Sequence, residues 1–250
     1  LLQTRGQIKA KHVQKRQLAP NNVIAIIPVR GHIIDSRSNP LKKVGDKCLI
    51  DWAIDSALRS RLVSKVLITS PDNQVINHVS NSYTEVMLHK RDVKLARINT
   101  AIEDTALEAL HFYSSSNDEP DALLMLYIEA PFRSTRYIDK AINTFQLYDV
   151  DVVDGVRTDD DILYVHRGNG LEPWQKDRKL RLEREELYRR AGGIHLIRVS
   201  TLKETKNMLA GRIGHIFLDQ QAAFTIKSDL DWEIADLIAS KEDLIEDMEK

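Results

Sequence analysis

The segment that follows the first apolar run of this sequence carries residues suited to binding phosphate. Arg30 and Gly31 directly follow residues 23–29 (VIAIIPV), and Arg37 stands a few positions further on in the same polar stretch. An arginine at a strand end can bind a phosphate or a base, and a glycine lets backbone N–H groups approach one closely. An ordinary salt bridge is the simpler role for Arg30, and Arg37 is a second candidate cation of the same loop.

A second group of candidates lies near the C-terminal end. Asp229 and Asp231 have carboxylates that suit a divalent cation, but acidic residues at a helix start also complement the helix dipole. The acidic run at residues 159–161 fits a surface turn better than a cation site. Of the eight histidines only His32 stands in the candidate loop, and the histidines show no metal-ligand spacing. Cys48 opens an apolar helical pattern, which favours a buried structural role over a nucleophile.

The composition is that of a soluble globular protein. The chain has 250 residues, with 42% hydrophobic and 29% charged residues, enough for one large α/β domain. Lys and Arg number 36 against 37 Asp and Glu, so the near-neutral charge gives no reason to expect nucleic-acid or membrane-surface binding. The single cysteine excludes an intrachain disulfide, and we expect a reducing, cytoplasmic location. Residues 1–21 are basic and polar and are expected to form an N-terminal arm that precedes a domain at 22–250.

The elements that must position these residues alternate between strand and helix. Continuous apolar runs predict strands buried on both faces, and apolar residues at helical spacing predict the helices between them. The predicted strands are 23–29, 65–70, 85–89, 122–128 and 150–156; the predicted helices are 49–62, 71–81, 103–114 and 135–148. This order predicts a mostly parallel, doubly wound sheet. Ligands of such sheets bind beyond the C-terminal ends of the strands, which points to the loop after residue 29.

The second half of the chain is less regular. Strands are expected at 162–166, 194–198, 213–217 and 222–226, with a turn at Gly168-Asn169-Gly170. A helix is expected from Ser200, as its N-cap, to Leu209, and another from Asp229. The densely charged residues 176–190 are either a solvated helix or part of a lobe of the domain.

Five stretches of the sequence resemble, in order, the acylneuraminate and 3-deoxyoctulosonate cytidylyltransferases. Residues 23–52 resemble that family's buried strand, its R-G-G-S-K-G-x-P-x-K-N loop and its Gly-Lys-Pro-Leu-Ile-x-Trp helix start. VLITSPD (66–72) resembles the strand ending in S-T-D-D, and LMLYIEAPFR (124–133) resembles L-L-Q-P-T-S-P-L-R. YRRAGGIHL (188–196) resembles Y-R-E-N-G-A-I-Y-I, and FTIKSDLDWEIA (224–235) resembles D-I-D-T-E-x-D-x-E-x-A. The resemblance covers about residues 22–240.

The resemblance implies a fold, a reaction and a set of site residues. The implied fold is a three-layer α/β/α domain with a mostly parallel, Rossmann-like sheet and a small dimerisation lobe at about 157–192. The implied reaction transfers CMP from CTP to an acidic, sialic-acid-like sugar with Mg²⁺, in a homodimer. The implied nucleotide-binding residues are Arg30, Gly31, His32, Asp72, Tyr127 and Arg133, with Arg30 and Arg37 as the catalytic cations and Asp229 and Asp231 as metal ligands.

The same resemblance shows where this sequence departs from the family. The loop positions of Gly, Ser, Lys and Gly hold His32, Ile33, Ile34 and Asp35, so the expected phosphate-binding lysine is absent and a carboxylate is added.

The family's two late aspartates fall on Thr225 and Lys227, and only a two-residue slip brings Asp229 and Asp231 to those positions. The sequence therefore leaves two functions open: a divergent cytidylyltransferase, or an inactive module of the same fold that serves binding or assembly. A related nucleotide-sugar transferase with another donor is a third option.

Overall fold

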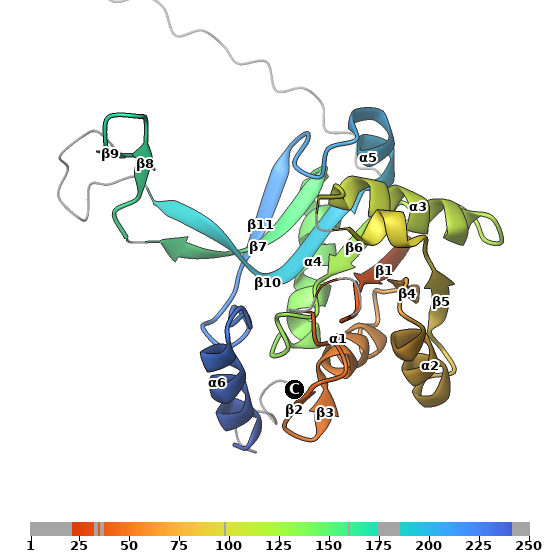
Figure 1. Cartoon of the computed structure of the whole chain (residues 1–250). Helices are drawn as coiled ribbons and strands as arrows, with labels where there is room; N and C mark the ends of the chain where they lie inside the picture. Colours follow the sequence, from red (N-terminus) through yellow and green to blue (C-terminus); the bar gives the residue numbers. More distant parts are fainter. Residues whose placement is uncertain are drawn as a thin grey trace, which may run out of the picture.

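The computed structural model describes residues 22–32, 35, 38–97, 99–159, 161–174 and 186–241. Within this part of the chain a seven-stranded sheet has the order β11-β7-β10-β6-β1-β4-β5 (Figure 1). Its strands are β1 (Val23–Pro28), β4 (Lys65–Ser70), β5 (Met87–Lys90), β6 (Ala122–Leu126), β7 (Val152–Asp159), β10 (Leu187–Arg198) and β11 (Ile213–Phe217). β10 is antiparallel to both of its neighbours, β6 and β7, and the other pairings in the sheet are parallel. The predicted mostly parallel sheet is confirmed.

The centre of the sheet is its most apolar part, as the continuous hydrophobic runs predict. Ile26 of β1 is paired with Leu67 of β4 on one side and with Met125 of β6 on the other. All three side chains are fully buried. Strands buried on both faces are typical of sheets covered by helices on two sides, because βαβ crossovers place the helices there.

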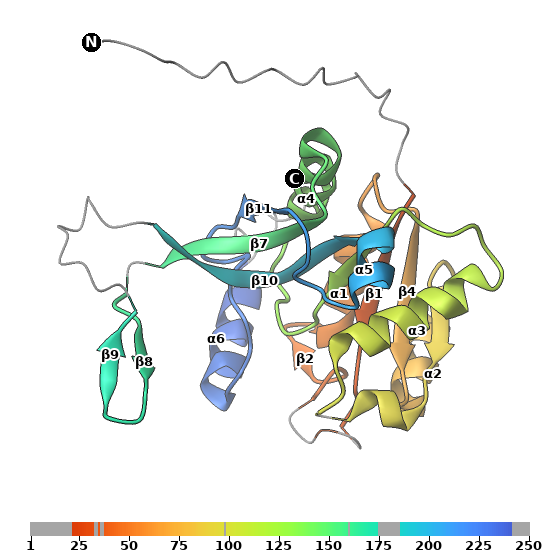
Figure 2. The ribbon, with the colours of Figure 1, turned by 90° about the horizontal axis from the view of Figure 1, so that it is seen from above.

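Helices cover both faces of this sheet, which makes a three-layer domain (Figures 1 and 2). Alternate residues of β1 point to opposite faces: Ala25 packs in one core cluster and Ile24 in the other. The first cluster contains residues of α1 (Leu49–Leu58), α2 (Asn73–Ser82), α4 (Thr135–Tyr148) and α6 (Asp229–Ala239). The second contains residues of α3 (Ile102–Ser114) and α5 (Val199–Thr205). A short 3₁₀ helix, η1 (Val93–Ala96), precedes α3.

Two small hairpins extend from this core. β2 (Lys43–Val44) and β3 (Lys47–Cys48) pair in the polar segment after β1, and α6 packs against their turn, where the Gly45 N–H donates to Asp236 at 3.1 Å. β8 (Tyr164–His166) and β9 (Leu171–Pro173) form a hairpin that stands away from the domain at the end of the long β7 and β10 strands (Figure 2). The turn at Gly168–Gly170 is confirmed.

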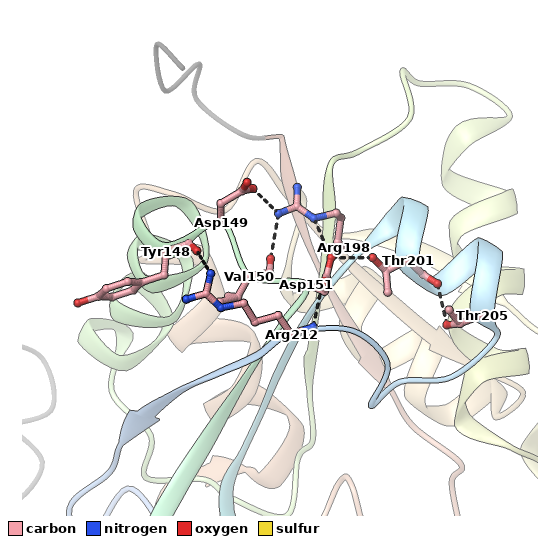
Figure 3. A network of polar contacts seen from close by, with 8 residues as sticks. All are labelled: Tyr148, Asp149, Val150, Asp151, Arg198, Thr201, Thr205 and Arg212. Carbon is pink, nitrogen blue, oxygen red and sulfur yellow. Dashed lines mark hydrogen bonds and ion pairs between the residues drawn. The ribbon is translucent and has the colours of Figure 1, made fainter. Parts of the chain in front are cut away.

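A polar network connects the segment before β7, the end of β10 and the segment before β11 (Figure 3). Asp151 accepts hydrogen bonds from the Arg212 N–H at 2.8 Å and from the Thr201 hydroxyl at 3.0 Å. Nε of Arg198 lies 3.5 Å from Oδ1 of Asp151, and its Nη2 donates to Oδ1 of Asp149 at 2.9 Å. Asp149 has a left-handed backbone conformation and caps the C-terminal end of α4. The Arg212 N–H is the first of several groups that hold the pKa of Asp151 below its ordinary value. The network joins α4, β10, α5 and the start of β11.

Several predicted boundaries are wrong. The segment 222–226 is not a strand: residues 222 and 223 lie in a turn, closed by the bond from the Phe224 N–H to the Gln221 carbonyl, and residues 224–226 have no regular structure. Residues 187–190 of the charged run belong to β10, while 176–185, like the N-terminal arm, lie outside the described residues. α2 begins after an Asp72 cap and not at Pro71, and α5 begins at Val199 without a Ser200 cap. α1 ends at Leu58, four residues early. None of the described helices is long and apolar enough to cross a membrane.

Candidate functional site

A pocket of about 570 Å³ opens where the parallel strands end, at the edge of the sheet that the sequence predicted. One wall comes from the end of β1 and the segment after it, and a second from the end of β6. The remaining walls come from residues 91–105, before and at the start of α3, and from residues 226–232, at the start of α6. The lining residues are Pro28, Val29, Arg30, Asp35, Ser38, Asn39, Arg91, Leu95, Thr100, Ile102, Thr105, Tyr127, Glu129, Ile226, Lys227, Ser228, Asp229 and Trp232.

Gly31 shapes the turn that leaves β1. Its φ of +80° lies in the left-handed region, and a Cβ there would stand 2.2 Å from an oxygen of Asp72. Asp72 is 5% exposed and is the N-cap of α2, where Oδ1 accepts from the Gln74 N–H at 2.8 Å. Any residue other than glycine would strain the turn and displace this cap, so the glycine fixes the direction in which Arg30 leaves the sheet.

Two arginines face the pocket: Arg30 follows β1 and Arg91 follows β5, with β4 between these two strands. Arg91 follows β5 and is 4% exposed, and its Nη2 donates to the Val29 carbonyl at 3.1 Å. Its buried Nε has no hydrogen-bond partner among the described residues. Burial, followed by the positive charge of Arg30, lowers the pKa of Arg91 to about 10, against a smaller opposing effect of Glu108. A buried positive charge close to a second positive charge favours the arrival of an anion.

The pocket wall also carries negative charge. Arg30 lies 3.5 Å from Asp35, the carboxylate that replaces a glycine in the resembled loop. This ion pair offsets the repulsion that Asp35 would otherwise exert on a phosphate. Counting only described lining residues, the cationic Arg30, Arg91 and Lys227 face the acidic Asp35, Glu129 and Asp229. A wall with both signs suits an anion that arrives together with a divalent cation.

The two aspartates at the start of α6 have different roles. Asp231 closes a capping box: its Oδ2 accepts from the Ser228 N–H at 2.8 Å and from the Lys227 N–H at 2.9 Å. The Lys227 N–H is the largest influence that holds the pKa of Asp231 below its ordinary value. Asp229 is exposed and lines the pocket, whereas Asp231 does not. The predicted pair is therefore not brought together as one ligand set.

A second hollow of about 360 Å³ adjoins the first and shares Tyr127, Glu129 and Lys227 with it. Arg190 lines only the second hollow, and its guanidinium lies 5.8 Å from the centre of the Tyr127 ring. Arg190 is held in place by Asp154, whose Oδ1 lies 2.9 Å from its Nε. The same Asp154 oxygen lies 2.7 Å from Nδ1 of the fully buried His195. The hollow thus presents a positioned cation beside Lys227.

The six predicted nucleotide-binding residues all lie in the described part of the chain, and only two of them line the pocket. Arg30 and Tyr127 line the pocket. Gly31 and Asp72 lie against each other behind the wall, and His32 is exposed in the loop.

Arg133 lies behind a turn, away from the wall. It is 1% exposed, and its Nη1 donates to the carbonyls of Tyr127, Gly192 and Gly193 at 2.8, 3.1 and 3.1 Å. This contact set indicates a structural role for Arg133. Arg37, Ile33 and Ile34 lie outside the described residues.

Sequence reasoning did not find Arg91. It directly follows β5, and its N–H pairs with the Ser70 carbonyl of β4, so it stands at the same sheet edge as Arg30. The rule that ligands bind where parallel strands end would have indicated it. Lys42 also reaches this region, and its Nζ lies 4.3 Å from the centre of the Trp232 ring on the pocket wall.

Comparison of the sequence with known proteins identifies relatives of this chain. The sequence description of a family named Cytidylyltransferase matches residues 24–228. The chain is 22% identical over 233 residues to post-translational flagellin modification protein B of Campylobacter coli, covering 90% of this chain and 97% of that protein. It is 30% identical over 128 residues to the pseudaminic acid cytidylyltransferase of Campylobacter jejuni, covering 49% and 52%. It is 27% identical over 124 residues to the N-acylneuraminate cytidylyltransferase of Escherichia coli O18:K1:H7, covering 50% and 28%.

Solved structures share the fold. The 4-diphosphocytidyl-2C-methyl-D-erythritol synthase of Anaerococcus prevotii superposes with a TM-score of 0.66 at 13% identity, over 89% of this chain and 97% of that one. A CMP:2-keto-3-deoxy-manno-octonic acid synthetase solved with CTP superposes with a TM-score of 0.62 at 14% identity, over 87% and 98%. At these identities the likeness is one of fold.

Proposed function

The chain belongs to the cytidylyltransferase family, and from this premise we propose that it transfers CMP from CTP to an acidic sugar, with release of pyrophosphate. The curated relatives that act as cytidylyltransferases are named for sugar acids, which supports this acceptor class. The pocket at the ends of β1 and β6 is the proposed nucleotide site.

The observation that carries the proposal is the pair Arg30 and Arg91. Arg91 is almost fully buried, remains positively charged at neutral pH and is raised in energy by the charge of Arg30. A buried cation of this kind costs stability, and a bound triphosphate would offset that cost by direct charge-assisted hydrogen bonds. These two side chains are therefore proposed to take over the role of the lysine that the loop lacks at Ile34.

The described wall also fits Mg²⁺, the metal that the family resemblance implies. Glu129 and Asp229 present carboxylate oxygens, the ligand type Mg²⁺ prefers, and the ion commonly uses only one or two carboxylates beside phosphate oxygens. We assign these two residues to the metal in place of the pair Asp229 and Asp231, because Asp231 is occupied as a helix cap. Mg²⁺ bound there would supply positive charge to the phosphates.

The second hollow is the proposed acceptor site. Arg190 and Lys227 offer two cations to the carboxylate of a sugar acid, and Asp154 orients the guanidinium of Arg190. In the transfer, an acceptor hydroxyl oxygen bonds to the α-phosphorus of CTP while the bond from that phosphorus to the bridging oxygen breaks. Pyrophosphate leaves with the bond's electron pair, and the hydroxyl proton passes to solvent. Arg30 and Arg91 stabilise the charge that develops on the leaving phosphates.

The test is pyrophosphate release in the presence of CTP, Mg²⁺ and a panel of eight-carbon and nine-carbon sugar acids. We expect release that depends on CTP, metal and at least one acceptor, and that falls at least tenfold in Arg91→Met. Arg136→Met is the matched control, because Arg136 is exposed and pairs with Asp219 away from the pocket. Silence across the panel, with CTP bound normally, would overturn the catalytic proposal.

A specific observation favours the alternative of an inactive module that still binds ligand. Lys227 stands on the pocket wall at the position where the family resemblance implies a metal ligand. A lysine there repels a metal ion but attracts phosphate. CTP binding without metal dependence and without turnover would support this alternative over the enzyme.

We further propose that the protein forms a homodimer through the lobe at residues 157–192 and the adjoining strands. Tyr188 of β10 and Phe217 of β11 are 44% and 46% exposed, and their rings lie 5.6 Å apart. His215 stacks on Tyr188 at 5.6 Å, so the three side chains form one aromatic surface on β10 and β11. An exposed aromatic surface of this kind suits a protein interface.

A further inference from the structure

Away from both hollows, a thiol, a carboxylate and an imidazole meet at the start of α1. The Sγ of Cys48, a carboxylate oxygen of Asp51 and a ring nitrogen of His78 all lie within 4.8 Å of one another. Nε2 of His78 is 2.9 Å from Oδ1 of Asp51. None of the three residues lines either hollow.

The local structure explains why these groups meet. Cys48 is the N-cap of α1 and Asp51 is the third residue of that helix, and side chains at these two positions face each other at a helix start. The Cys48 side chain makes no capping hydrogen bond, so its sulfur is not committed to the backbone. His78 reaches the pair from the middle of α2. The side chains of Asp51 and His78 are only 14% and 26% exposed, so much of their desolvation has already occurred on folding.

The set of donors selects the metal. Mg²⁺ and Ca²⁺ take oxygen ligands, whereas a thiolate, an imidazole and a carboxylate together suit Zn²⁺. Zinc holds such ligands at about 2.0–2.3 Å in a tetrahedron, which places neighbouring donor atoms roughly 3.5 Å apart. The observed cluster needs movements of about 1 Å to reach this geometry. Nearby, Lys47 is already paired with Asp55 at 2.7 Å, which reduces its repulsion of a bound cation.

We propose that Cys48, Asp51 and His78 form a zinc-binding site that is separate from the nucleotide pocket. A thiolate and a carboxylate balance the charge of the ion, and the fourth position is open to water. On binding, the thiol of Cys48 gives its proton to solvent as the sulfur–zinc bond forms. The ion joins the start of α1 to α2 and so holds the end of the segment whose earlier residues, Ser38 and Asn39, line the pocket.

The first test reads the site in the unchanged protein. Cys48 is the single cysteine of the sequence, so the rate of alkylation of the native protein reports on this site alone. We expect stoichiometric Zn²⁺ to slow alkylation at least tenfold and Mg²⁺ to leave the rate unchanged. Alkylation at the same rate with and without Zn²⁺ overturns the proposal, whether or not CTP binds elsewhere.

The second test uses Co²⁺ as a spectroscopic probe of the same site. We expect one Co²⁺ per chain and a thiolate-to-cobalt charge-transfer band that Cys48→Ser abolishes. Asp51→Asn and His78→Gln should each weaken Zn²⁺ binding at least tenfold in calorimetry. His111→Gln is the matched control, because His111 is an exposed residue of α3. A band that survives Cys48→Ser, or equal zinc affinity in all variants, contradicts the assignment.

Discussion

Replacing Arg91 by methionine should strengthen the fold and weaken ligand binding. Arg91 is 4% exposed, and in the free protein its charge is stabilised by few partners, among them the Val29 carbonyl. Burial, and then the charge of Arg30, lowers its pKa to about 10. Both the folded and the unfolded chain carry this charge at neutral pH. The free energy that corresponds to the lowered pKa of Arg91 therefore destabilises the folded state in full.

The magnitude follows from that shift. A pKa lowered this far corresponds to about 3 kcal/mol of destabilisation by the charged form, at 1.36 kcal/mol for each unit. Methionine removes this cost, but it leaves the buried carbonyl of Val29 without its donor, which costs about 1–2 kcal/mol. We therefore expect Arg91→Met to raise the free energy of unfolding by about 1–2 kcal/mol and Tm by roughly 2–8 °C.

Ligand affinity should move in the opposite direction. Loss of a hydrogen bond to a charged phosphate costs about 1.5–3 kcal/mol, so the Kd for CTP should rise about 10- to 100-fold. Thermal melts without ligand and calorimetric titration of CTP with Mg²⁺ measure the two effects. Arg136→Met, from an exposed position, should leave CTP affinity unchanged. A variant that is less stable and binds CTP normally would refute the reasoning and make Arg91 a structural residue.

Four further substitutions test other parts of the account. Gly31→Ala should destabilise the protein by roughly 3 kcal/mol in denaturant unfolding, because its Cβ would stand 2.2 Å from Asp72 Oδ2. Gly168→Ala is the control: Gly168 has a φ of +91° and no atom within 4 Å of an added Cβ, so this change should cost only the backbone strain of about 1–2 kcal/mol. Equal losses of stability in the two variants would contradict the close-contact argument. Asp151→Asn should lower the free energy of unfolding by about 1 kcal/mol at pH 7. Because folding lowers the pKa of Asp151, this stabilisation is present above the unfolded carboxyl pKa and fades as pH falls through the lower folded value, so a mutant deficit that persists in acid would contradict it. Phe217→Ser should raise the dimer dissociation constant at least tenfold in sedimentation, and a monomeric parent protein would exclude the dimer.

The central sheet was predictable because its physical signal is strong and local. Runs such as residues 23–29 and 122–128 are too apolar to stand anywhere except inside a covered sheet, and they form β1 and β6. The loop after β1 was found for the same reason, since ligands gather where such strands end. Arg30 is a lining residue because it directly follows one of these runs.

The parts that failed depend on contacts between distant segments. Residues 222–226 have strand-like composition, but Ala222 and Ile226 fill the core from a turn and from the irregular segment after it, with Asp219 accepting the Ala222 N–H at 2.7 Å. Arg133 has the sequence position of a ligand contact, yet the carbonyls of Gly192 and Gly193 hold it from a strand far along the chain. Local pattern does not encode such pairings, so neither the apolar pattern of residues 222–226 nor the family resemblance around Arg133 predicted them.

The different roles of Asp229 and Asp231 could not be predicted from the sequence either. Both are acidic residues of one helix start, and sequence alone treats them alike. Only the side-chain geometry shows that Asp231 closes the capping box while Asp229 faces the pocket. The Cys48, Asp51 and His78 cluster was likewise not found, because His78 is distant in sequence from the other two.

A crystal structure of the protein with CTP and Mg²⁺ tests the central claim most directly. The account predicts phosphate oxygens within hydrogen-bonding distance of both Arg30 and Arg91, with the metal against Asp229 or Glu129. A nucleotide bound elsewhere, or phosphates that approach neither arginine, would contradict it.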